Sequence, residues 1–242
     1  MIDGLRSLPR EHGATLSALG MTILGPLCAA ALPPTAILVA LGSAAGLLAS
    51  LSLLGGERPM ALAVISAGLF AAAFTTGPWS MLPFAAGAAA LGALPVAAPA
   101  AARRRRLIPM AGAFLATAMV APLTFVAAGG SLERAVVLMV LTSAYLLTVL
   151  LAVRRRLGVR PDGGPLGAVA VTAAGMALTA LVALAGGAVS PWVCLALAPG
   201  LGRLPAGLAG RDKSLRPRTI GLLELGLLTL FVVLTRLLWP GA

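Results

Sequence analysis

The sequence predicts an all-α bundle of about nine membrane-spanning helices, and three observations lead to this fold class. First, 60% of the 242 residues are hydrophobic and 10% are charged, whereas a soluble domain carries about 25% charged residues. Second, the apolar residues fall into runs near the roughly 20-residue length that a bilayer requires. Third, basic residues gather in short segments between these runs. We therefore expect one transmembrane domain over residues 1–242, with the lipid bilayer around it.

Prolines, glycines and arginines mark the boundaries of the predicted spans. Pro33 and Pro34 end the first run and Gly55 and Gly56 close the second, because both residue types interrupt helices. The expected spans are 14–32, 35–54, 60–76, 80–101, 107–128, 132–153, 165–185, 191–204 and 217–238. The eighth range is short, and prolines within the fourth are expected to bend it.

The positions of the basic residues predict the orientation of the chain. With nine spans, sixteen of the eighteen basic residues fall on one side, and only Arg134 and Arg236 fall on the other. Cytoplasmic loops are enriched in Lys and Arg, so we expect the N-terminus in the cytoplasm and the C-terminus outside. Trp79, Trp192 and Trp239 then fall at outer ends of spans, where interfacial anchors belong. The excess of alanine, glycine and arginine suggests a bacterial genome, and hence the bacterial cytoplasmic membrane.

Two polar residues within the spans are candidates for chemistry. Glu224 lies seven residues into the last range, about 10 Å deep at 1.5 Å per residue. An acid at that depth either pairs with an arginine and fixes packing, or marks a functional site. Tyr145, the single tyrosine, lies at a similar depth in the sixth range. It is either a packing aromatic or part of the same site.

The start of the first span and the nearby arginines offer further candidates. His12, the single histidine, follows Glu11 at the cytoplasmic mouth of the first span. The histidine is a candidate general acid or base because its unperturbed pKa lies near physiological pH. The alternative is a helix start in which Glu11 favours the positive helix end. Arg10, Arg154 and Arg218 are candidates for binding an anionic ligand or, alternatively, for anchoring to anionic lipid headgroups.

Several classes of site have no support in the sequence. Asp3, Asp162 and Asp212 are isolated, and there is no phosphate-binding glycine loop, no His-Glu-x-x-His and no Cys-x-x-Cys. We therefore predict no metal site, and the sequence names no cofactor and no reaction. The arginine clusters are short and lack interleaved aromatic residues, which argues against nucleic-acid binding.

Three segments carry a resemblance to a known family. They are residues 8–14 (LPREHGA), 145–157 (YLLTVLLAVRRRL) and 217–224 (PRTIGLLE). They resemble the opening, the end of the sixth helix and the final helix of the YwiC-like family of bacterial integral membrane proteins. The chain departs from that family at Thr15, where an aromatic residue is usual. The family has no established activity, so the resemblance implies a membrane protein without naming its function.

A looser similarity is to the UbiA-type prenyltransferases, which have nine helices and an active site open to the cytoplasm. That family binds magnesium diphosphate through two Asp-rich motifs, whereas the corresponding loops here lack paired carboxylates. Three hypotheses follow. The first is a cytoplasm-facing polar pocket for a small or lipidic anion. The second is a UbiA-like transferase acting on an isoprenoid with altered metal motifs. The third is a small-solute transporter or an assembly factor for a membrane complex.

Overall fold

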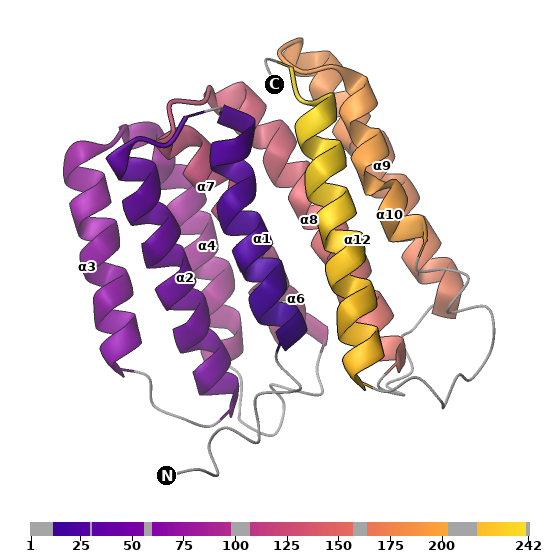
Figure 1. The fold of residues 1–242 in the computed structure, drawn as a ribbon, viewed down its shortest axis with the longest axis horizontal. Helices are drawn as coiled ribbons and strands as arrows, with labels where there is room; N and C mark the ends of the chain where they lie inside the picture. The colour runs from indigo at the N-terminus through magenta and orange to yellow at the C-terminus, as the bar shows by residue number, and fades with distance from the viewer. Residues whose placement is uncertain are drawn as a thin grey trace.

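The chain folds into a bundle of helices that run side by side (Figure 1). The computed structural model describes residues 12–29, 31–55, 60–97, 107–156, 164–202 and 217–240, over which it contains helices and turns and no strand. The α-helices are α1 (His12–Ala29), α2 (Pro34–Gly55), α3 (Met60–Thr76), α4 (Leu82–Ala97), α6 (Leu107–Ala118), α7 (Val120–Ala127), α8 (Leu132–Arg156), α9 (Gly164–Gly186), α10 (Ala198–Leu201) and α12 (Pro217–Leu238). Two 3-10 helices, η3 (Trp79–Met81) and η4 (Pro191–Leu197), precede α4 and α10.

The all-helical class is confirmed for the described residues, and the helical segments coincide with the predicted ranges. Three stretches, Met110–Ala127, Leu132–Ala152 and Leu166–Gly186, are long and apolar enough to cross a membrane. Two predicted spans are divided. The range 191–204 consists of η4 followed by α10, and the range 107–128 consists of α6 and α7, separated at Met119.

A proline accounts for the division at Met119. Pro122 has no backbone N–H, so it cannot donate the usual helical hydrogen bond to the carbonyl of Ala118. The Thr142 hydroxyl of α8 lies 3.0 Å from that carbonyl oxygen and 2.7 Å from the carbonyl oxygen of Leu138 in its own helix. The carbonyl that Pro122 leaves without a helical donor thus faces a hydroxyl on the neighbouring helix. This contact fixes the register of the end of α6 against α8.

Helix α7 lies in the core, because all eight of its residues are buried. It packs against α1, α2 and α8. At Gly25 of α1 the two backbones approach so closely that a Cβ atom would overlap Thr124 and the carbonyl of Ala121. Small residues at a helix interface allow this kind of packing in a bilayer.

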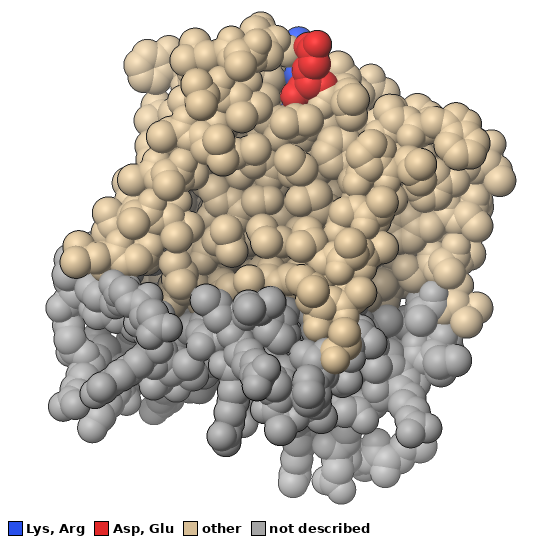
Figure 2. Space-filling model, turned by 180° about the vertical axis from the view of Figure 1, so that it is seen from behind, with Lys and Arg blue, Asp and Glu red and all other residues tan. Residues whose placement is uncertain are grey.

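The outer surface of the bundle is apolar. On the face shown in Figure 2, the described acidic and basic side chains lie at one end, and the rest of the described surface carries neither. Large hydrophobic side chains are exposed on many helices; they include Ile23, Leu41, Val64, Ile65, Leu166, Leu178, Leu181, Leu184, Leu222, Leu230 and Leu237. Such a surface is far larger than the apolar patches of soluble proteins, and it suits contact with lipid.

The three tryptophans do not behave alike. Trp79 and Trp192 are 76% and 67% exposed, as expected for interfacial anchors. Trp239 is only 2% exposed, and its ring stands edge-on to Phe125 with the ring centroids 5.6 Å apart. The prediction of an interfacial anchor is therefore wrong for Trp239, because its ring packs against Phe125 of α7 instead of facing outward.

Candidate functional site

The candidate residues near the helix ends fall at one end of the bundle. His12 begins α1, Arg218 lies in the first turn of α12 and Arg154 in the last turn of α8. Helices α1 and α12 begin at the end of the bundle where α8 ends (Figure 1). Arg10 and Glu11 lie outside the described residues, as do the side chains of His12, Arg154 and Arg218. The topology therefore places residues 12, 154 and 218 at one end of the bundle.

Tyr145 joins α8 to α12. Its side chain is fully buried, and its ring stacks on Phe231 with the centroids 4.0 Å apart and the planes 18° from parallel. Phe231 is also fully buried. The Thr148 hydroxyl donates to the carbonyl of Tyr145 over 2.6 Å. The stack supports the packing interpretation of Tyr145, and a chemical role for its hydroxyl stays a prediction.

Glu224 shares one face of α12 with Phe231. Residues 224, 228 and 231 are spaced four and three apart, so they stack on one side of a helix. The Leu228 side chain packs against Gly20 of α1. A Cβ atom added at Gly20 would lie 3.0 Å from the Cδ2 atom of Leu228. Glu224 is itself half-buried. The acid therefore lies on the side of α12 that faces α1 and α8, about 10 Å along the helix from Phe231.

The described residues do not form a metal centre. Within the described ranges no three His, Cys, Asp or Glu side chains come together. The two loops that correspond to the UbiA-type magnesium motifs are residues 57–58 and 154–162. Except for residues 154–156 at the end of α8, they lie outside those ranges. The structure therefore does not test the prenyltransferase hypothesis through its metal site.

Sequence reasoning overlooked a second group of polar residues at the opposite end of the bundle. Arg134 lines a pocket of about 460 Å³ there, and Arg236 and Trp239 lie in and just beyond the last turn of α12. A signal was present in the sequence, since Arg134 and Arg236 are the two basic residues that depart from the charge asymmetry. In the sequence, Arg134 and Arg236 bear only on the predicted orientation of the chain and are not identified as candidates for a site.

Comparison with known protein families, with curated proteins and with solved structures gives no match to this chain. Its function must therefore be argued from its own residues.

Proposed function

We propose that the chain is a multi-pass protein of the bacterial cytoplasmic membrane, similar to the YwiC-like family, with nine spans and a cytoplasmic N-terminus. Support comes from the apolar exposed surface and from the clusters of arginine between helices. Alkaline phosphatase, which is active only outside the cytoplasm, can be fused after Gly130 and after Arg58. We expect activity at Gly130 and none at Arg58. The reverse pattern, or equal activity at both, would refute the orientation.

We also propose that the protein binds a small or lipidic anion at its cytoplasmic end, between α1, α8 and α12. The observation that carries this proposal is the Tyr145–Phe231 stack. This stack joins α8 to α12, and the contact of Leu228 with Gly20 joins α12 to α1. Both contacts lie on the face of α12 that bears Glu224. An acid kept within a membrane helix is costly and is by default a functional residue.

The arginines near this interface supply the attraction for an anion. Arg154 and Arg218 lie at the same end of the bundle as the start of α1. Guanidinium groups stay charged and match the geometry of phosphate and carboxylate oxygens. In this proposal the arginines would provide the charge complement of the anion and the Tyr145 hydroxyl a further donor. Glu224 would accept hydrogen bonds from the arginines and so position them.

Native mass spectrometry of the protein released gently from its own membrane tests the site. The variant Arg218→Gln should lower the occupancy of a co-purifying anion by roughly tenfold, as the loss of a charged hydrogen bond predicts. Glu224→Gln should also lower it, by a smaller factor, because the arginines lose the acceptor that positions them. Tyr145→Phe keeps the ring stack and should affect occupancy less. Thr229→Val, on the exposed side of α12, is the matched control and should leave occupancy unchanged.

The identity of the bound mass separates this proposal from the alternatives. A prenyl diphosphate retained only with magnesium would establish the UbiA-like transferase instead. A bound polypeptide with no small molecule would favour an assembly factor, and solute flux in proteoliposomes would favour a transporter. Unchanged anion occupancy in both charge variants would show that Glu224 and Arg218 do not form the site.

A further inference from the structure

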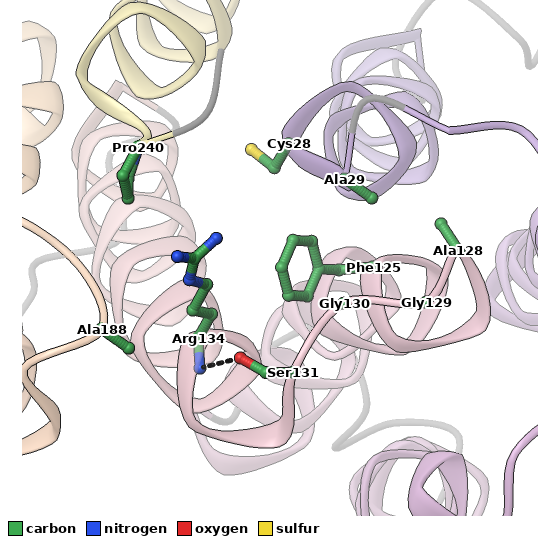
Figure 3. A pocket seen from close by; sticks show the side chains of 10 residues that line it. All are labelled: Cys28, Ala29, Phe125, Ala128, Gly129, Gly130, Ser131, Arg134, Ala188 and Pro240. Atoms are coloured by element: carbon green, nitrogen blue, oxygen red, sulfur yellow. Dashed lines mark hydrogen bonds between the residues drawn. The ribbon is translucent and has the colours of Figure 1, made fainter.

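A pocket of about 460 Å³ lies at the end of the bundle opposite Glu224. Its walls come from the end of α1 (Cys28), from α7 (Phe125), from the turn before α8 (Ser131) and from Pro240 after α12. Figure 3 shows the guanidinium group of Arg134 extending into the space between Pro240, Cys28 and Phe125. Its volume lies within the range of small-molecule sites.

Two buried donors without partners lie behind the wall of this pocket. The Arg236 Nη1 and Trp239 Nε1 atoms are both buried and have no hydrogen-bond partner among the described residues. Arg236 is in the last turn of α12, four residues before Pro240 of the wall, and the Trp239 ring stands edge-on to Phe125 of the wall. Buried polar groups in native proteins are almost always hydrogen-bonded. The unmet donors next to this wall therefore favour an acceptor bound in the pocket, where Arg134 is the charged group that lines it.

The donors around the pocket define the chemistry of that acceptor. The guanidinium groups of Arg134 and Arg236 stay charged at all physiological pH values. Ser131 Oγ accepts a 3.5 Å hydrogen bond from the Arg134 backbone N–H, so its own hydrogen remains available to donate. The nearby carboxylate of Glu133 is exposed and does not line the pocket. A phosphate group, with several acceptor oxygens and a geometry matched by guanidinium, fits this set of donors.

A second pocket points to a lipid as the source of the phosphate. It has a volume of about 360 Å³, shares Ala188 and Pro240 with the first pocket, and is lined by Leu184. Leu184 is 65% exposed on the apolar surface of α9. An amphipathic molecule could therefore place its headgroup by Arg134 and its tail along α9.

We propose that this pocket binds the phosphate group of a phospholipid from the outer leaflet. The site is independent of the one proposed at Glu224, because Arg236 and Glu224 are twelve residues apart on α12, about 18 Å along the helix axis. Loss of binding at either site leaves the other in place.

The test uses delipidated, purified protein with an affinity tag at the C-terminus, so that the terminal carboxylate cannot supply the anion. The probes are phosphatidylglycerol, diacylglycerol with the same chains, and inorganic phosphate. Bound lipid is counted by native mass spectrometry, and the thermal unfolding midpoint is measured in parallel. We expect phosphatidylglycerol to bind and to raise the midpoint, and diacylglycerol to do neither.

Substitutions then assign the binding to this pocket. Arg134→Gln should weaken phosphatidylglycerol binding roughly tenfold, as expected for a lost charge-assisted hydrogen bond. Arg236→Gln removes a charge behind the pocket wall, and Trp239→Phe keeps an aromatic ring but removes the N–H donor, so a smaller loss of about threefold is expected for each. Glu133→Gln, a neighbouring charge change outside the pocket, is the matched control and should not weaken binding.

Three results would overturn the proposal. The first is that the wild type and the Arg134→Gln variant bind phosphatidylglycerol equally. The second is that diacylglycerol binds as well as phosphatidylglycerol. The third is that Glu133→Gln weakens binding as much as Arg134→Gln does. Stabilisation by inorganic phosphate as large as that by phosphatidylglycerol would overturn the lipid source and assign the pocket to a soluble phosphate. Arg134 extends into the pocket rather than into the core, so we expect Arg134→Gln to fold. Its binding therefore tests the proposal even if Arg236→Gln folds poorly.

Discussion

Helices α8 and α9 are neighbours of nearly equal apolarity that lie in different surroundings. Their apolar stretches are both 21 residues long, with mean hydropathies of 2.4 and 2.1, yet 61% of the α8 stretch is buried and only 22% of the α9 stretch. Helix α8 packs against α6, α7 and α9, whereas α9 presents Leu178, Leu181 and Leu184 outward. Hydropathy cannot separate the two, because lipid tails are as apolar as leucine.

What distinguishes the two helices is the placement of small and polar residues. Helix α8 buries Thr142, Tyr145 and Thr148, and the Thr142 hydroxyl also reaches the Ala118 carbonyl of the neighbouring helix α6. Helix α9 meets it through Gly175, which lies against Ala144. The side of a membrane helix that faces protein is therefore marked by residues that pack closely or need a hydrogen bond, rather than by greater apolarity.

The largest change in stability is expected from a substitution that breaks the contact between Gly175 and Ala144. In Gly175→Leu the new side chain would overlap Ala144 at its first atom, and we expect a loss of at least about 3 kcal/mol in the free energy of unfolding. The control is Ala174→Leu, one residue away on the exposed side of α9. It should change stability by less than about 0.5 kcal/mol. Reversible unfolding in mixed micelles measures both, and equal effects would contradict the proposed packing of α9.

An effect of intermediate size is expected when one leucine of α8 and one of α9 are each replaced by alanine. Leu141 of α8 is fully buried and Leu181 of α9 is 62% exposed. Leu141→Ala should cost about 2–4 kcal/mol, because it leaves a cavity between helices. Leu181→Ala should cost less than about 1 kcal/mol, because lipid fills the lost volume. Similar losses in the two variants would mean that α9 is covered by protein, for example by a second copy of the chain.

The sequence predicts the helices well, because each apolar run ends in proline, glycine or arginine. It does not predict which faces meet, since Leu141 and Leu181 occupy the same kind of run and differ only in their neighbours. Trp239 shows the same limit. Its position at a helix end suggests an anchor, and only its contact with the Phe125 ring of α7 explains why it is buried.

The candidate sites were predictable to different degrees. Glu224 and Tyr145 stand out in the sequence as polar residues within apolar runs. That they face the same helix interface follows only from the stacking of Tyr145 on Phe231, and nothing in the sequence marks Phe231 as important. Arg134 and Arg236 lie about a hundred residues apart in the chain. Each is an isolated exception to the charge rule in the sequence. Only the fold places Arg134 in a pocket whose wall includes Pro240, four residues after Arg236.

The smallest expected effect concerns the hydrogen bond between α8 and the interrupted helix beside it. Thr142→Val removes the hydroxyl that lies 3.0 Å from the Ala118 carbonyl, whose helical donor is missing because residue 122 is proline. We expect a loss of about 1 kcal/mol, since that buried oxygen is left without a donor. The control is Thr229→Val, because the Thr229 hydroxyl is exposed and bonds only within its own helix, to Leu225.

The control should cost nearly nothing, because the Leu225 carbonyl keeps its helical partner when the threonine is replaced. Both variants exchange the same hydroxyl for a methyl group, so the difference in their unfolding free energies isolates the contact between helices. If Thr142→Val proved as harmless as Thr229→Val, the hydrogen bond to the Ala118 carbonyl would not stabilise the packing of α8. The polar residues of α8 would then no longer explain why this helix, and not α9, lies in the core.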